Sequence, residues 1–154
     1  RKAVSETGRD LGSMGEIVEV NRDFLKMFLD GGYVPVVSPI GLADDGTSLS
    51  INADMVAAAL AVAVGASKLL HLTDVAGILD SPDGELVRQL TAADLTRRME
   101  AGAITGGMKW KAQSILTALR GGVARVHVLD GRQPHTVIAE LFTDRGVGSL
   151  VTLE

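Results

Sequence analysis

The 154-residue sequence contains no cysteine, and aromatic residues make up only 3% of it. The lack of cysteine excludes disulfide bonds and thiolate metal sites. The low aromatic content argues against a surface on which nucleic acid bases stack. The net charge is −4 with both signs interspersed, so no basic stripe indicates nucleic acid binding.

Long hydrophobic runs are also absent. No apolar run approaches membrane-spanning length, and residues 1–10 lack the apolar stretch of a signal peptide. His71, His127 and His135 lack metal-ligand spacing, so no metal site is predicted. We therefore expect a soluble, cytoplasmic protein. The hydrophobic content of 46% suits one compact domain with a sizeable core.

The chain begins with RKAVSETGRD, without an initiating methionine. This polar stretch reads like a linker inside a protein, and we expect the chain to be a fragment of a longer one.

Apolar patterning predicts strands that alternate with helices through most of the chain. Strands are predicted at 16–20, 33–38, 68–73, 85–90, 125–129 and 149–153, and helices at 23–30, 53–66, 92–99, 108–119 and 134–142. A hairpin or a protruding turn is predicted at 41–50. This order predicts an α/β fold with a mainly parallel twisted sheet and helices on both faces, in three α/β/α layers. Ligands of such sheets bind beyond the carboxyl ends of the strands, which directs attention to 38–40, 73–77, 130–132 and a glycine loop.

The glycine loop lies in ITGGMKWKAQSILTAL, where Gly106 and Gly107 precede a helix that opens with Lys109 and Lys111. A helix N-terminus carries partial positive charge, so lysines there are unfavourable unless an anion faces them. The arrangement resembles a phosphate cradle, although it matches neither G-x-x-x-x-G-K-[ST] nor G-x-G-x-x-G. The alternative is a flexible hinge followed by two solvated lysines. From the residues alone this is a candidate anion site: Lys109 fits the solvated alternative well, and Lys111 fits it less well if Asp54 lies opposite.

Asn52 and Asp54 lie where a loop enters the apolar helix, and both residue types favour the N-cap position. Capping needs only one of them, and a second, buried carboxylate would need a cation, for which Lys111 is the candidate. Capping alone is the alternative. In the segment from Thr73 to Gly77, the hydroxyl and backbone amides suit phosphate or ribose, although an ordinary turn with a capping aspartate has the same pattern.

Taken together, four segments resemble the acetylglutamate kinases of the amino acid kinase superfamily: GYVPVVSPIG, INADMVAAALAVAVGASKLLHLTDVAGIL, GAITGGMKWKAQSIL and GGVARVHVLDGRQPHTVIAELFTDRGVGS. They occur in family order from about residue 10 onward. The resemblance implies an enzyme that uses MgATP to phosphorylate the γ-carboxylate of N-acetyl-L-glutamate, a step of arginine biosynthesis. It also implies that 1–15 is the remnant of a preceding lobe and 16–154 a nucleotide-binding domain.

The resemblance assigns roles position by position. Lys111 resembles the lysine that stabilises charge on the transferring phosphoryl group, and Asp54 the aspartate that orients catalytic lysines. Asn52 resembles a residue near the acetylglutamate, and Ser50 replaces its usual companion asparagine. The two ATP-holding loops correspond to Thr73, Asp74, Val75, Gly77, Ile78 and Leu79, and to Ala103, Ile104, Thr105, Gly106, Gly107 and Met108. Mg²⁺ is expected to be held mainly by the nucleotide phosphates.

In arginine-inhibited members of the family, positions corresponding to His127, Glu140 and Gly146 line the inhibitor site, and all three match. L-Arginine is therefore an expected ligand, because a carboxylate pairs well with a guanidinium. The alternatives are a solvated Glu140 and a hydrogen-bonded strand residue at His127. The family's first phosphate loop, second Gly-Gly turn and substrate-binding arginine have no counterpart in this sequence. We accordingly expect an ATP-binding half of a homo-oligomeric kinase; an arginine-sensing domain and a kinase for another acidic substrate stay open.

Overall fold

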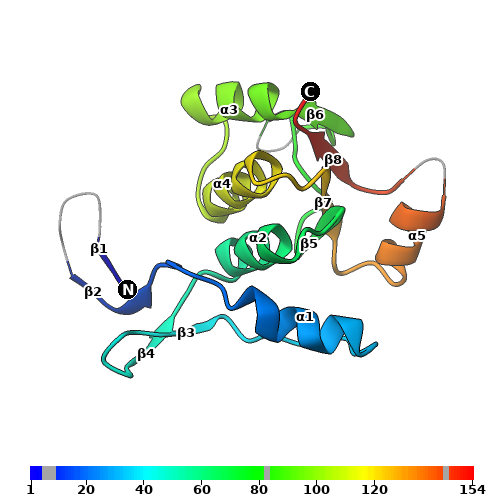
Figure 1. Ribbon diagram of the computed structural model, residues 1–154. Coiled ribbons are helices and arrows are strands. Elements are labelled where there is room, and N and C mark those ends of the chain that lie inside the picture. Colours follow the sequence, from blue (N-terminus) through cyan, green and yellow to red (C-terminus); the bar gives the residue numbers. More distant parts are fainter. Residues whose placement is uncertain (5–9, 82–83, 144–145) are drawn as a thin grey trace.

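The computed structural model of the chain describes residues 1–4, 10–81, 84–143 and 146–154. Within these residues the strands form two four-stranded sheets, and helices lie on both sides of the second sheet (Figure 1). The α/β class and the placement of helices on both faces are confirmed. The division of the chain at residue 15 stays a prediction, and residues 5–9 of its first part lie outside the described residues.

The first sheet has the order β1-β2-β4-β3. Its strands are β1 (Lys2–Val4), β2 (Asp10–Gly15), β3 (Ile40–Leu42) and β4 (Ser48–Ser50). Strands β3 and β4 form the predicted hairpin. Its turn is closed by Asp45, whose Oδ1 accepts a hydrogen bond from the Thr47 amide, and by Gly46 at φ +83°. The hairpin leads the chain directly into helix α2.

The second sheet has the order β5-β7-β8-β6. Its strands are β5 (Lys68–Thr73), β6 (Gln89–Thr91), β7 (Arg125–Asp130) and β8 (Ser149–Thr152). The pairs β5–β7 and β6–β8 are parallel, as the alternating pattern predicts, but the central pair β7–β8 is antiparallel. The parallel pair β5–β7 places Thr73 opposite Asp130, so the carboxyl ends of both strands meet at one edge.

Five helices lie in the described residues: α1 (Arg22–Asp30), α2 (Ala53–Val64), α3 (Ala92–Glu100), α4 (Gly107–Arg120) and α5 (Thr136–Phe142). Local signals explain their ends. The predicted caps Asn21 and Thr91 accept hydrogen bonds from amides of α1 and α3, and α4 ends before Gly121. Helices α2 and α4 pack together, with α5 on the other side of the second sheet (Figure 1).

The core lies between α3, α4 and the second sheet, and α2 packs on it. Its fully buried side chains include Ala58, Leu95, Ile115, Val126 and Val128. Helix α4 buries one face, from Lys111 to Leu119, against this core, while its first turn is largely exposed. The N-terminus of α4 therefore lies at the surface on a firmly packed support.

Three strand predictions are wrong in whole or in part. Residues 16–20 and 33–38 form no strand, and the strand predicted at 85–90 forms only from Gln89. An alternating or apolar pattern gives a strand only where a neighbouring strand supplies a run of hydrogen-bond partners. Within 85–88 the described contacts amount to an isolated bridge between Leu79 and Leu86 and single backbone hydrogen bonds. Helix α5 begins two residues after Pro134, because His135 takes the left-handed conformation at φ +61°.

Candidate active site

Asp54 and Lys111 form the ion pair predicted from the sequence. Lys111 Nζ donates to Asp54 Oδ1 at 2.6 Å, and their side chains are 11% and 23% exposed. Asn52 makes this possible, because its side-chain oxygen caps α2 by accepting from the amides of Asp54 and Met55. The Asp54 carboxylate is therefore left to face α4. One carboxylate and one ammonium group thus meet where α2 and α4 begin.

His71 joins this pair and was missed in the sequence analysis. Its Nδ1 lies 3.2 Å from Asp54 Oδ1, and its Nε2 lies 3.1 Å from the Ser114 hydroxyl. Burial lowers the pKa of His71 to about 4, an effect that Lys111 reinforces and Asp54 opposes. A histidine inside the apolar strand KLLHLT, together with a serine three residues after Lys111, was the available signal.

Gly106 and Gly107 leave open space at the entrance of α4. Gly106 has φ +58°, a conformation that favours glycine. A side chain added at either glycine would meet no atom within 4 Å. The rest of the predicted loop is exposed except for the partly buried Met108 and for Ile104, which is buried and anchors the loop to the core. Exposed backbone at a helix N-terminus suits an anion.

The other predicted nucleotide loop divides into an accessible and a packed part. Thr73 and Asp74 lie at the carboxyl end of β5, where the Thr73 hydroxyl donates to Asp74. Gly77 and Ile78 are buried, and the Ile78 amide donates to the Ser149 hydroxyl. A side chain at Gly77 would lie 2.7 Å from that hydroxyl, so the structure gives this glycine a packing role. The remaining members are the partly buried Val75 and Leu79.

A second charged pair lies at the same sheet edge. Arg132 donates through Nε and a terminal nitrogen to the two oxygens of Asp130. These bonds hold the pKa of Asp130 at about 2, against the opposing effect of burial. The sheet pairs Asp130 with Thr73, so Arg132 places an exposed guanidinium near the predicted ATP loop.

The predicted substrate residues lie beside the site. Ser50 is exposed at the end of β4, two residues before the cap of α2. Asn52 is partly buried, with its side-chain oxygen engaged in capping. Both roles toward a substrate stay predictions.

His127, Glu140 and Gly146 are brought together, as the resemblance implied. His127 Nδ1 lies 2.7 Å from Glu140 Oε1, and Glu140 Oε2 accepts from the amides of Val147 and Gly148. Gly146 has φ +54°, and a side chain there would lie 2.9 Å from Glu140 Oε2. The alternative of a solvated Glu140 is wrong, because its side chain is buried. Among the described residues, His127 Nε2 is buried without a hydrogen-bond partner.

Burial favours a raised pKa for Glu140, but the hydrogen bonds from His127, Val147 and Gly148 outweigh it and lower the pKa. The anionic form of the carboxylate is thus already stabilised by groups of the chain itself.

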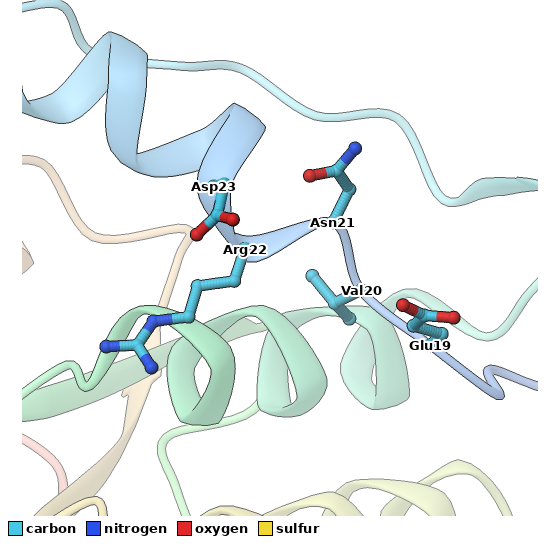
Figure 2. A pocket seen from close by; sticks show the side chains of 5 residues that line it. All are labelled: Glu19, Val20, Asn21, Arg22 and Asp23. Atoms are coloured by element: carbon cyan, nitrogen blue, oxygen red, sulfur yellow. The ribbon is translucent and has the colours of Figure 1, made fainter.

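Two hollows lie away from these residues. The larger, of about 560 Å³, is lined by Glu19, Val20, Asn21, Arg22 and Asp23 at the start of α1 (Figure 2). Figure 2 shows their side chains pointing in different directions from one continuous segment, so no set of groups converges on a ligand. The second hollow, of about 440 Å³, runs under α1 and is mostly apolar.

In the described parts of the chain, no group of three or more histidine or acidic side chains is placed to hold a metal ion. No helix within those parts has the length and apolar character needed to cross a membrane.

The profile of the amino acid kinase family matches residues 2–130. The acetylglutamate kinase of Methanocaldococcus jannaschii is 47% identical over 145 residues, which are 93% of this chain and 48% of that protein. The acetylglutamate kinase of Clostridioides difficile is 46% identical over 147 residues, 94% of this chain and 51% of that protein. The chain thus spans about half the length of these curated relatives.

A solved structure of N-acetylglutamate synthase from Neisseria gonorrhoeae, complexed with coenzyme A and L-arginine, aligns with a TM-score of 0.90 and 30% identity. The alignment covers all of this chain and 36% of that one. Since the family profile covers most of the sequence and the fold agrees, the chain belongs to the amino acid kinase family.

Proposed function

We propose that this chain is the ATP-binding half of a kinase that phosphorylates the γ-carboxylate of N-acetyl-L-glutamate. The observation that carries the proposal is the ion pair of Asp54 and Lys111 at the entrance of α4, next to the open glycines. The similarity to curated acetylglutamate kinases supports the choice of substrate. Use of ATP follows the family, and Mg²⁺ would be held mainly by the nucleotide phosphates. A cytoplasmic location belongs to the same proposal.

The reaction breaks the bond between the γ-phosphorus and the oxygen bridging to the β-phosphate. A new bond forms between the phosphorus and a carboxylate oxygen, giving ADP and an acyl phosphate. Such transfers need positioned cations more than covalent help. Lys111 would supply the positive charge, Asp54 would hold its ammonium group in place, and the amides of Gly106 and Gly107 would face the phosphates.

We expect nucleotide binding and catalytic turnover to be distinct properties of this chain, of which it has mainly the first. The family's lysine-bearing phosphate loop and substrate-binding arginine have no counterpart in these 154 residues, which span about half the length of the curated relatives. We therefore expect nucleotide binding with little or no turnover by the chain alone, and a homo-oligomer for the whole enzyme.

Calorimetry with MgATP tests the proposal. Lys111→Ala should weaken ATP binding by about tenfold or more, because it removes a charge-assisted contact to phosphate. Lys109→Ala is the matched control, since Lys109 is exposed two residues earlier in the same helix turn. Gly107→Leu should also weaken binding by filling the open space at the helix entrance. Folded wild-type protein that shows no heat or thermal shift with MgATP contradicts the proposal.

L-Arginine binding is a second candidate function, and two observations favour it. His127, Glu140 and Gly146 cluster together, and the similar N-acetylglutamate synthase was solved with L-arginine. Glu140 is engaged by the chain, so arginine would have to exchange with existing hydrogen bonds. Calorimetry with L-arginine should show binding that Glu140→Gln abolishes and Lys111→Ala preserves. The glutamine oxygen can still accept from both amides, which protects the fold.

A kinase for another acidic substrate is the remaining alternative, and Ser50 keeps it open. Serine is shorter than the asparagine that the resemblance expects there. With the whole enzyme, Ser50→Asn should lower the KM for N-acetyl-L-glutamate. An unchanged KM for N-acetyl-L-glutamate with a better rate on a longer acidic analogue favours the alternative.

A further inference from the structure

We propose that His71 is a positioning residue of this site, holding the Asp54 carboxylate that orients Lys111. The inference rests on the proposed function and adds two residues, His71 and Ser114, to its machinery. Three elements meet through these contacts: Asp54 comes from α2, His71 from β5, and Lys111 and Ser114 from α4.

Asp54 Oδ1 is shared by two groups, Lys111 Nζ at 2.6 Å and His71 Nδ1 at 3.2 Å. The terminal torsion of an aspartate is broad, and a lysine on a flexible stem does little to restrict it. His71 is different because its side chain is only 3% exposed and is carried by a strand of the second sheet. A contact from this fixed ring restricts where the carboxylate, and so the ammonium group, can lie.

The groups that face the two ring nitrogens indicate one neutral form of the imidazole. A carboxylate only accepts, so His71 Nδ1 carries a proton toward Asp54. In the neutral ring Nε2 is an acceptor, and the Ser114 hydroxyl lies 3.1 Å from it. The same hydroxyl lies 2.7 Å from the Lys111 carbonyl, so it has two acceptors between which to donate. The lowered pKa of His71 agrees with a neutral ring at pH 7.

The order Ser114, His71, Asp54 is also that of a hydrolytic triad, but this structure excludes that use. Ser114 is completely buried, at 0% exposure, and its hydroxyl is within hydrogen-bond distance of the backbone of its own helix. No substrate carbonyl can reach it for attack. The buried contacts therefore hold the ring in place.

His71 also connects the ion pair to the predicted nucleotide loop. It lies two residues before Thr73 on β5, and alternate residues of a strand share one face. The strand that presents Thr73 to the ligand thus carries the ring that holds Asp54. This placement makes the Lys111 ammonium group part of the same rigid edge.

The test compares two variants of similar shape at position 71, and its readout is a ratio of two nucleotide affinities. His71→Asn keeps an N–H donor near the Nδ1 position, whereas His71→Leu has the same shape without a donor. The readout is the affinity for MgATP divided by that for MgADP, which isolates the terminal phosphate. His71→Leu should lower this ratio about fivefold, the value of one ordinary hydrogen bond, and His71→Asn should stay within about twofold of wild type. An equal ratio in all three proteins overturns the inference, as does an equal loss in both variants.

A second measurement, made without nucleotide, tests which nitrogen of His71 carries the proton. In ¹⁵N-histidine NMR spectra at pH 7, His71 should be neutral with its proton on Nδ1; a proton on Nε2 overturns the inference. Should His71→Leu fail to fold, His71→Gln replaces it, because its amide lies near the Nε2 position and leaves Asp54 unsupported. Wild type that binds no nucleotide overturns the proposed function and this role with it. If the wild type binds ATP but substitution of His71 does not change the ratio of MgATP to MgADP affinity, only the inference is overturned.

Discussion

His71 makes the stability of the chain sensitive to mild acid. Burial and the nearby Lys111 keep its folded-state pKa at about 4, below the 6.5 of an ordinary histidine, although Asp54 opposes the shift. Between these values the unfolded chain binds a proton that the folded chain does not. The free energy of unfolding therefore falls as the pH is lowered from about 6.5 to about 4, by up to about 1.4 kcal/mol per pH unit from this group.

His71→Asn removes this titration, so its stability should decline less steeply over the same pH interval. Urea unfolding at several pH values gives, for each protein, the slope of the unfolding free energy against pH. The stability of each protein at neutral pH serves as its own reference. Parallel slopes in the two proteins would contradict a buried neutral histidine.

The residue scale also shows what sequence reasoning can find. The ion pair of Asp54 was predictable from the sequence. Asn52 and Asp54 are both capping residue types, but one residue is enough to cap the helix, so the other side chain needs a cation. His71 was not, because its partner Ser114 is met only through the packing of distant elements. Glu140 was named only through the family resemblance, and its bonds to Val147 and Gly148 depend on a loop conformation. A histidine inside an apolar strand signals that it needs a buried partner, but the strand pattern does not say which residue faces it.

At the scale of elements, α2 and α4 contact each other at a glycine. Gly121 has an ordinary φ of −81°, so backbone strain does not require glycine there. A side chain would instead lie 2.3 Å from Val62 Cγ2 of α2. Valine in a helix has one strongly preferred rotamer and cannot move aside easily.

Gly121→Ala should therefore destabilise the fold by about 1–3 kcal/mol through overpacking. On a Val62→Ala background the same substitution should cost much less, because the clashing methyl groups are gone. Chemical denaturation of the four proteins gives the coupling. Equal costs on both backgrounds would show that α2 and α4 do not meet as described.

Helices were predicted better than strands for a physical reason. The caps Asn21, Asn52 and Thr91 and the stop at Gly121 are local signals that act within each helix. Strands need partners from elsewhere, so the pattern in 33–38 predicted a buried strand that the structure does not contain. Strands β5 and β7 were predicted well because each follows a helix and pairs with the other in register.

On the scale of the whole molecule, an extended apolar segment lies on the surface. Val34 and Val36 are 89% and 97% exposed, and within the described residues 33–38 belong to no strand. An exposed apolar stretch with open backbone groups is a site for association. We predict that this chain self-associates as its concentration rises through the micromolar range.

Val34→Thr with Val36→Thr should reduce this association in sedimentation measurements. Phe142→Ser is the matched control, because Phe142 is similarly exposed on the separate helix α5. A chain that stays monomeric, or one in which only Phe142→Ser matters, contradicts the prediction.

The central proposal also belongs to the whole molecule: α2, α4 and β5 bring Asp54, Lys111 and His71 together. We propose that Lys111 meets the terminal phosphate of a nucleotide there. The most direct test follows the lysine side-chain ammonium resonances by ¹⁵N NMR, assigned with Lys111→Arg and Lys109→Arg. MgATP should shift the Lys111 resonance clearly more than MgADP does, while Lys109 moves little with either. A nucleotide that binds while Lys111 stays unmoved, or moves no more than Lys109, would contradict the account.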